Sequence, residues 1–219
     1  MMLLNPGYET PNSPVYEYEG SLYYNAKSGT CYDGRTVSCD FTDTGLQSSE
    51  EKEMIEEAVW NLGELSTSSS GDDNYETAFA STWYTYERST EVSSDSANWT
   101  GKIGLMYASD YGFATSGGNT TNRETCLNTA LYNWDSVSDC FNNDWLYDSS
   151  GWQWTLNASS TASYVVFSVT SDGKVYYNDT NPYYMISTGV YVFPTLYLSS
   201  NVKISDGEGS KENPYQLSL

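Results

Sequence analysis

The chain has 219 residues, of which 29 are acidic and nine are basic, for a formal net charge of -20. A field of that sign repels phosphate backbones and anionic lipid headgroups, which argues against nucleic-acid binding and against direct attachment to a membrane surface. Histidine is absent, so the commonest general acid-base residue and the commonest zinc ligand are both missing, and catalysis is disfavoured.

Tyrosine is unusually abundant. The 21 tyrosines stand among many Ser, Thr, Asn and Gly residues, a mixture typical of contact surfaces, although Tyr-rich strands of a β domain would account for it as well. No apolar run approaches the ~20 residues that a membrane span needs, and the initial MMLL is too short for a signal peptide. We expect a mature ectodomain.

Residues 1–47 are predicted to form an extended N-terminal segment, because three early prolines exclude a helix and VYEYEGSLYY alternates like two strands around a turn. A helix is predicted over 49–62, with Ser48 as N-cap and Gly63 as terminator. Its apolar side chains recur at helical spacing and should pack against the C-terminal sheet: Met54, Ile55, Ala58, Val59 and Leu62.

A second helix is predicted within 75–89, where Tyr75, Phe79, Trp83 and Tyr86 recur at steps of three and four. The following stretch, from 103 to 144, is rich in Gly, Asn and Thr and is expected to be irregular. A long ordered loop of this kind carries either function or a scaffold role.

The C-terminal third is predicted to be β. Asp172-Gly173 suits a two-residue type I′ turn, a register that pairs Ser168 with Tyr177, Val169 with Tyr176 and Thr170 with Val175. It places Tyr177 on the exposed face, whereas a slip of one residue would reverse the assignment. Residues 189–204 are then expected to form one central strand, with a bulge or local edge at Pro194.

Four cysteines form two close pairs in the sequence, which favours the disulfides Cys31–Cys39 and Cys126–Cys140. The sequence alone allows three connectivities. An even number of cysteines in an acidic, Ser/Thr-rich chain fits an extracellular location at the cell surface, and four free thiols would indicate an intracellular one.

The stretch from Cys140 to Leu156 contains three of the seven tryptophans. Trp154 alternates with Leu156 and is expected in the core, as is Trp145. Trp152 follows a Ser-Ser-Gly run and is expected at a loop edge, where it is the best contact candidate of the three.

No cofactor is expected, but calcium is a candidate at two oxygen-rich clusters, 72–74 and 142–144. Neither cluster has EF-hand spacing, and Asp/Asn runs also form solvated turns.

An ordered set of motifs runs through the chain from residue 98 onward: NWTGKIGLMYASDYGFATSGG, CLNTALYNWDS, CFNNDWL, WTL, a Val-rich hairpin, GVYVFPTLYLSSNVKI and GEGSKENPYQL. In this order the motifs resemble a family of bacterial surface proteins that often follow a pilin-like membrane segment and whose domain looks like a C-type-lectin-like fold. That fold is shared with formylglycine-generating enzymes and with variable proteins diversified by retroelements. The resemblance covers residues 50–219 well and the first 45 loosely.

Two positions depart from the family pattern. The last long strand has Phe193 where relatives typically have an arginine, and Tyr147 stands in place of the arginine of a Trp-Leu-Arg-Ser element. Either the pairing partners have changed or these positions are free to vary.

The resemblance implies an α+β fold with a mixed or antiparallel sheet, one or two helices, long irregular loops and two disulfides, formed by residues 48–219. It implies a noncatalytic recognition module that binds a protein or a glycan at the cell surface. The alternative is a structural pilin-like subunit of a surface filament. An enzyme is a third hypothesis, but the cysteines lie upstream of the position that formylglycine-generating enzymes use. The candidate ligand-binding residues are Tyr147, Asp148, Trp152, Tyr164, Tyr177, Tyr183 and Tyr184.

Overall fold

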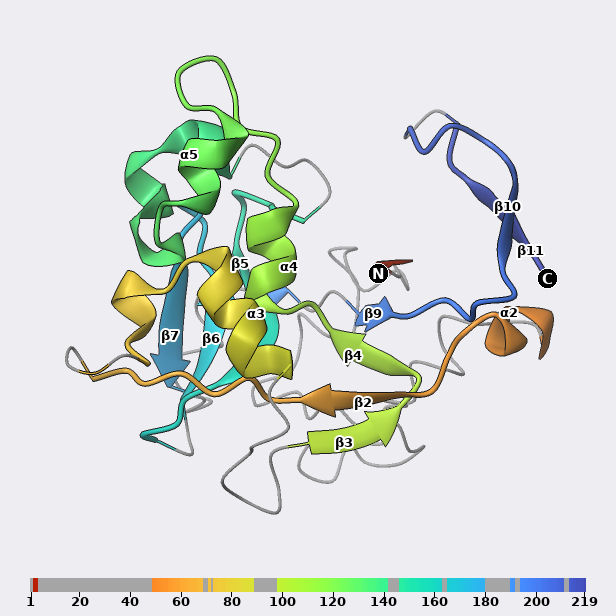
Figure 1. Ribbon diagram of the computed structural model, residues 1–219, viewed down its shortest axis with the longest axis horizontal. Helices are drawn as coiled ribbons and strands as arrows, with labels where there is room; N and C mark the ends of the chain where they lie inside the picture. Colours follow the sequence, from red (N-terminus) through yellow and green to blue (C-terminus); the bar gives the residue numbers. More distant parts are fainter. Residues whose placement is uncertain are drawn as a thin grey trace.

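The computed structural model describes the following residues: 2–3, 49–68, 71, 73–88, 98–141, 146–162, 165–179, 190–191, 194–210 and 213–219. They form an α+β fold of short helices and small sheets (Figure 1), so the predicted fold class is confirmed at that level. Within the described residues, no helix has the length and apolar character needed to cross a membrane.

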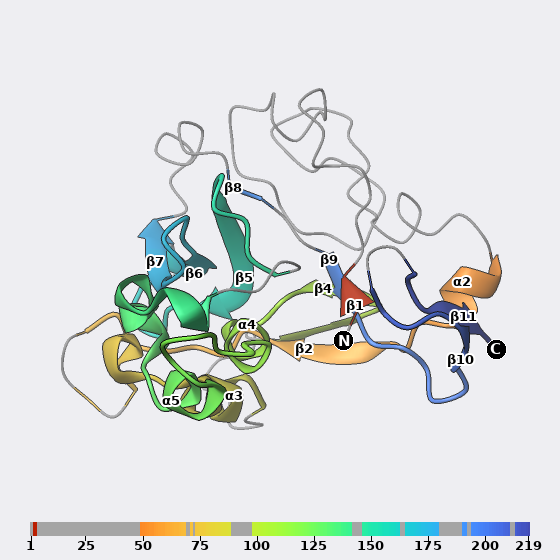
Figure 2. The same cartoon turned by 90° about the horizontal axis from the view of Figure 1, so that it is seen from above.

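The largest sheet has four strands in the order β7-β6-β5-β8. Neighbouring strands are antiparallel except for β5 and β8, which run parallel. Figure 2 shows the helices α3, α4 and α5 on one side of this sheet. The elements of this layer pair are β5 (Trp152–Ala158), β6 (Val165–Val169), β7 (Val175–Asp179), β8 (Val190–Tyr191), α3 (Ala80–Arg88), α4 (Ala108–Phe113) and α5 (Arg123–Leu127).

Short 3-10 helices complete this layer, and three smaller sheets with a short α-helix form the rest of the described fold. The turns are η1 (Tyr75–Thr77), η2 (Leu131–Ser136) and η3 (Ser138–Cys140). The remaining elements are β1 (Met2–Leu3) with β9 (Pro194–Leu196) and β4 (Ile103–Leu105), β2 (Ala58–Asn61) with β3 (Asn98–Gly101), β10 (Lys203–Asp206) with β11 (Gln216–Ser218), and α2 (Ser49–Glu53).

The main hydrophobic core lies between the four-stranded sheet and the helices. Trp83 of α3 packs edge-on against Phe167 of β6, with ring centroids 4.8 Å apart, and both side chains are fully buried. Gly112 brings α4 against α3, since a Cβ there would lie 2.6 Å from the Cβ of Ala80. The helix predicted within 75–89 is therefore confirmed over its second part, where Trp83 anchors it to the sheet.

The helix predicted over 49–62 is wrong beyond Glu53. The chain leaves α2 and forms β2, which pairs with β3. Trp60 explains the difference, because it lies outside the predicted helical stripe and yet is fully buried, with its indole Nε1 donating to the Gly101 carbonyl at 2.9 Å. Ile55 is buried as expected, whereas Val59 is 57 % exposed. Burial of the largest side chain outweighed helical periodicity.

The hairpin of β6 and β7 is confirmed, but its predicted register is wrong by one residue. Phe167 pairs with Tyr177, and Val169 pairs with Val175. The loop has three residues rather than two, closed by the Thr170 N–H donating to the Lys174 carbonyl at 2.9 Å. Gly173 takes φ of 85° at the third loop position, the conformation that follows a type I turn in such hairpins.

Two further predictions need correction. The single strand expected over 189–204 is divided among three sheets, since β8 pairs with β5, β9 pairs with β4 and β1, and Lys203 and Ile204 belong to β10, which pairs with β11. The region from 103 to 144 was expected to be irregular, but its described part, 103–141, contains one strand, two helices and two 3-10 turns. These elements are too short for hydrophobic periodicity in the sequence to indicate them.

The disulfide Cys126–Cys140 is confirmed, with an S–S distance of 2.09 Å, and joins α5 to η3. Cys31 and Cys39 lie outside the described residues, as does almost all of the N-terminal segment predicted over 1–47.

Candidate functional site

The residues predicted from the sequence to bind a ligand lie in different environments. Tyr147 is half-buried, with its hydroxyl donating to the Ser171 carbonyl at 2.5 Å, and Asp148 is exposed. Trp152 is half-buried in β5, and Tyr177 is half-buried in β7. Tyr164, Tyr183 and Tyr184 lie outside the described residues, as does Trp145. Trp154 is half-buried against the smaller core cluster around Trp60.

Tyr177 belongs to a tyrosine cluster at the outer strand of the sheet, formed by Tyr75, Tyr132, Tyr176 and Tyr177. The rings of Tyr176 and Tyr177 stack with centroids 4.7 Å apart, and Tyr75 meets the Tyr177 ring edge-on at 5.5 Å. Tyr132 stacks on Tyr176 at 6.0 Å. Because Tyr177 lies opposite Phe167, it shares the face of the sheet that covers the main core rather than the exposed face predicted for it.

Lys174 covers the same cluster, with its ammonium 5.9 Å from the Tyr132 ring and 5.7 Å from the Tyr176 ring. It also pairs with Asp135 at 3.0 Å and Asp172 at 3.4 Å. The hydrogen bond to Asp135 raises the pKa of Lys174 above its ordinary value, and Asp172 acts in the same direction. The aromatic rings of the cluster thus pack on one another and on Lys174, and Lys174 is paired with two carboxylates. We therefore interpret the tyrosine cluster as a structural feature of the fold.

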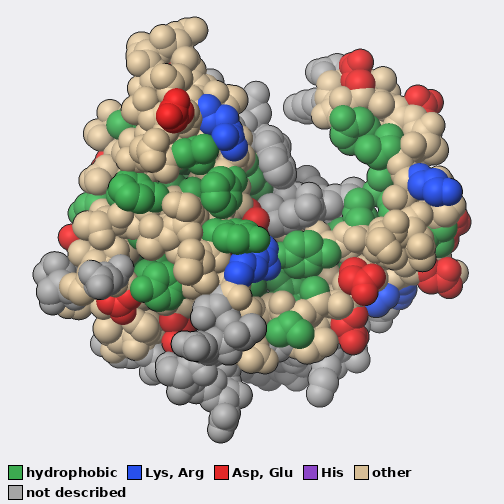
Figure 3. All heavy atoms as spheres, in the orientation of Figure 1, with side chains coloured by type: hydrophobic (Ala, Val, Ile, Leu, Met, Phe, Trp, Pro, Cys, Tyr) green, Lys and Arg blue, Asp and Glu red, His purple; other side chains and the backbone are tan. Residues whose placement is uncertain are grey.

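A second group of aromatic side chains remains exposed to solvent on α3 and α4 and directly before α3. Tyr84 is 48 % exposed, Phe79 is 40 % exposed and Phe113 is 38 % exposed. The Tyr84 and Phe113 rings meet edge-on with centroids 6.0 Å apart, which joins α3 to α4. We call these three residues the helical aromatic face; hydrophobic side chains gather over the helices in Figure 3. Exposed aromatic groups of this kind are typical of recognition surfaces.

Arg88 borders this face at the end of α3. Its guanidinium lies 5.4 Å from the Tyr84 ring centroid, 5.1 Å from that of Tyr107 and 5.7 Å from that of Tyr197, to whose hydroxyl it donates at 2.8 Å. Cation–π contacts therefore hold the guanidinium beside the exposed ring of Tyr84. The arrangement adds positive charge to an aromatic surface of a strongly acidic protein.

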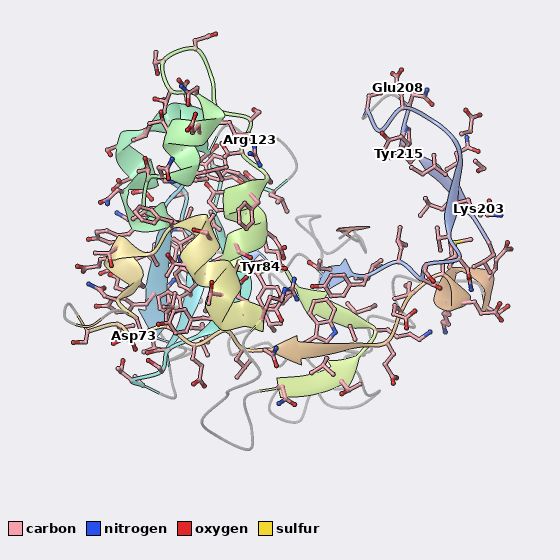
Figure 4. The ribbon with its side chains drawn as sticks, in the orientation of Figure 1. Asp73, Tyr84, Arg123, Lys203, Glu208 and Tyr215 are labelled. Atoms are coloured by element: carbon pink, nitrogen blue, oxygen red, sulfur yellow. A yellow bond between two sulfur atoms is a disulfide. The ribbon has the colours of Figure 1, made fainter. Side chains whose placement is uncertain are left out.

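Arg123 borders the other end of the helical aromatic face, beyond the end of α4 (Figure 4). It lines an open pocket of about 530 Å³, which we call the arginine pocket and whose walls come from α3, α4 and α5. Its lining residues are Ser81, Phe113, Arg123, Glu124, Leu127 and Asn128.

Local capping and the disulfide hold the walls of the pocket. Asn122 caps α5, with its side-chain oxygen accepting from the Thr125 N–H at 2.9 Å. Asp139 fixes the preceding loop by accepting from the Thr120 and Thr121 N–H groups, both at 2.6 Å. These hydrogen bonds lower the pKa of Asp139, the largest effect coming from the Thr120 hydroxyl. Together with Cys126–Cys140, they make α5 a defined wall rather than a loose loop.

The buried carboxyl group of Glu87 in α3 accepts hydrogen bonds from the first turn of α4. Its Oε1 accepts from the Ser109 N–H and from the Asn157 side-chain amide, both at 3.0 Å, and its Oε2 accepts from the Ser109 hydroxyl. Burial raises the pKa of Glu87 to about 7, although the hydrogen bonds from Ser109 and Asn157 lower it. A perturbed carboxyl is a feature of catalytic acids, but Glu87 has no exposed surface, so here it positions α4 beside α3.

The sequence did not indicate the helical aromatic face or the arginine pocket. Phe79 was grouped with the buried Trp83 by its spacing, and Phe113 and Arg123 lay in the stretch expected to be irregular. One usable signal was Asn122 followed by Thr125, which has the form of a helix N-cap. No local pattern indicated that α3, α4 and α5 would meet.

Metal binding finds no support within the described residues, where no group of three His, Cys, Asp or Glu residues lies close enough to hold an ion. Of the two predicted calcium clusters, Asp72 and residues 142–144 lie outside the described part of the chain. The side-chain oxygen of Asn74 already accepts from the Glu76 N–H at 2.9 Å, so it serves as the cap of η1.

Comparison with known proteins gives no significant match to a protein family, to a curated protein or to a solved structure.

Proposed function

We propose that this protein is a noncatalytic recognition module of the bacterial cell surface that binds a protein or glycan partner through exposed aromatic side chains. The observation that carries the proposal is the helical aromatic face, where Phe79, Tyr84 and Phe113 remain 38 to 48 % exposed, with Arg88 beside Tyr84 and Arg123 in one pocket with Phe113. Large rigid rings give contact area at low entropic cost, and Arg and Tyr are enriched among the residues that dominate binding energy.

The C-type-lectin-like fold is part of this proposal and rests on the motif resemblance. A four-stranded sheet with helices on one side, a disulfide and long connections is compatible with such a domain. In this reading the sheet and helices form a rigid support, and the residues on its surface vary to suit the partner. An extracellular location follows from the same resemblance and agrees with the disulfide.

The test is a screen of the purified protein against glycan and protein arrays, followed by titration of any hit with single variants. Tyr84→Ala and Phe113→Ala represent the helical aromatic face, while Trp152→Ala and Tyr177→Ala represent the residues predicted from the sequence. Loss of a central aromatic contact should weaken binding by about 2 kcal/mol or more.

Tyr215→Ala is the matched control, because Tyr215 is also an exposed aromatic residue, 52 % exposed, but lies next to β11. It should bind as the wild type does. If the Trp152 variant loses binding and the Tyr84 and Phe113 variants do not, the contact face lies at β5. Because Tyr177 packs against the main core, its variant counts only when it unfolds at the same urea concentration as the wild type. If no variant changes the affinity of a confirmed partner, recognition through exposed aromatic residues is wrong.

A structural subunit of a surface filament is the second candidate, and the β10–β11 ribbon favours it. Every residue of β10 is exposed, and the ribbon stands away from α4 and α5 in Figure 1. Ile204 is 60 % exposed. Because isolated two-stranded ribbons are marginally stable and open strand edges invite pairing, a neighbouring copy would stabilise this one. Light scattering and electron microscopy of the wild type and of Ile204→Asp test this function, and a monomer at every concentration would refute it.

A further inference from the structure

Arg123 is held in one orientation by backbone carbonyls at the end of α4 and just beyond it. Its Nε–H donates to the Thr115 carbonyl and its Nη2–H donates to the Phe113 carbonyl, both at 3.0 Å. These two donors share one edge of the planar guanidinium. The second edge, formed by Nη1 and Nη2, has no hydrogen-bond partner among the residues that the structure describes, and a guanidinium edge of this kind matches the two oxygens of a carboxylate.

Besides Arg123, the arginine pocket is lined by two apolar side chains, two neutral polar side chains and one carboxylate, that of Glu124. Phe113 is 38 % exposed, and Leu127 adds apolar surface to the same pocket. Ser81 and Asn128 are exposed and supply a hydroxyl and an amide, which can donate and accept. The pocket is open to solvent, and its volume of about 530 Å³ lies within the range of small-molecule sites.

Charge narrows the class of ligand further. Glu124 lines the same pocket as Arg123, and the whole chain carries a net charge of -20. A polyanion would therefore be repelled, whereas a ligand with a single carboxylate needs only the open edge of Arg123. The remaining groups suit a ligand that has several hydroxyls and one apolar face, which describes a pyranose ring.

We propose that the arginine pocket binds the carboxylate of an acidic sugar residue, with the sugar ring against Phe113 and its hydroxyls toward Ser81, Glu124 and Asn128. This inference rests on the proposed recognition function and specifies its ligand as an acidic glycan.

The experiment is a titration of the ¹⁵N-labelled protein with methyl β-glucuronide, with methyl β-glucoside as the uncharged match. A single ring of this size should bind with a Kd on the order of 1 mM. The Arg123 Nε–Hε signal gives a direct readout, since the chain has only three arginines. We expect saturable shifts of this signal with the glucuronide, and binding of the glucoside that is weaker by about tenfold or more.

Two substitutions of Arg123 separate hydrogen-bond geometry from charge. Arg123→Lys keeps the charge but lacks the planar pair of donors, so it should weaken glucuronide binding by about tenfold or more. Arg123→Gln and Lys203→Gln each remove one positive charge, but only Arg123 lines the pocket, so only its variant should lose glucuronide binding. Lys203 is exposed on β10, so its variant should bind as the wild type does.

Three results would overturn the inference. The first is that the glucuronide and the glucoside bind equally or not at all. The second is that Arg123→Lys binds the glucuronide as the wild type does. The third is that N-acetylglutamate methylamide, a carboxylate without a sugar ring, binds as tightly as the glucuronide. The recognition function fails separately, on the array screen. If an array partner binds the wild type but not Tyr84→Ala, and the glucuronide does not bind, the recognition function stands and the acidic-glycan ligand is wrong. If the glucuronide binds but no array partner is found, the pocket binds the sugar and the recognition function lacks support.

Discussion

Replacing Glu87 by glutamine tests whether the buried carboxyl limits the stability of the protein at neutral pH. Glu87 is fully buried, and burial raises its pKa from the ordinary value of 4.5 to about 7. The neutral carboxyl is thus the form that suits the folded state. In the unfolded chain the same group is exposed to water and ionises near its ordinary value.

The sign follows from the number of protons that each state binds. Below pH 4.5 the carboxyl is protonated in both states, so Glu87 imposes no ionisation cost. Between pH 4.5 and about 7 the folded state holds a proton that the unfolded state has lost, so the free energy of unfolding falls as pH rises. Above about pH 7 the loss is complete and amounts to about 3 kcal/mol.

Glutamine reproduces the shape and the hydrogen bonds of the neutral acid. Its Oε1 can accept from the Ser109 N–H and from the Asn157 amide. Ser109 donates its hydroxyl to Oε2 of the carboxylate, but it would accept from Nε2 of the glutamine as it would from a protonated Oε2. Glu87→Gln should therefore match the wild type near pH 4.5 and exceed its free energy of unfolding by up to about 3 kcal/mol near pH 8.

The assay is urea unfolding followed by tryptophan fluorescence, with wild type and variant measured side by side across this pH range. The other carboxylates contribute equally to both proteins, so the difference between the two curves isolates Glu87. Glu53→Gln removes one exposed acidic charge from α2 and reports the effect of net charge alone. A difference that stays constant with pH, or a glutamine variant less stable at every pH, would refute the reasoning.

Two further predictions concern β2 and the disulfide. Trp60→Ala should lower the free energy of unfolding in urea by about 3–5 kcal/mol, because it empties a fully buried site. Val59→Ala should change it by less than about 0.5 kcal/mol, because Val59 is exposed. A larger loss for Val59→Ala than for Trp60→Ala would favour the helix predicted over 49–62 instead of β2. Replacing both Cys126 and Cys140 by alanine should cost about 3 kcal/mol for a loop of sequence separation 14. Intact-mass analysis should show a gain of two hydrogens on reduction of this pair and two more if Cys31–Cys39 also forms, and an unchanged unfolding midpoint in the double variant would contradict a stabilising role.

Features of the protein that depend on neighbouring residues could be predicted from the sequence. The second helix was recognised from the spacing of Trp83 and Tyr86, and the β hairpin from its apolar strands around a Gly-containing turn. The bond between Cys126 and Cys140 followed from their proximity in the chain. In each case the interacting groups lie close together in the sequence, at most 14 residues apart for the disulfide, so local preferences and local contacts act in the same direction.

Only the tertiary structure decided the features that depend on distant segments. Trp60 could be buried, with its N–H satisfied, only once β3 lay beside it, and this pairing replaced a helix that the local pattern favoured. The hairpin register also depended on the core, because the one-residue difference decides whether Tyr177 lies on the face of the sheet that carries Phe167 and meets Tyr75. The arginine pocket exists because α3, α4 and α5 pack together, and side-chain exposure at Tyr84 and Phe113 is a property of that packing, which no sequence pattern encodes locally.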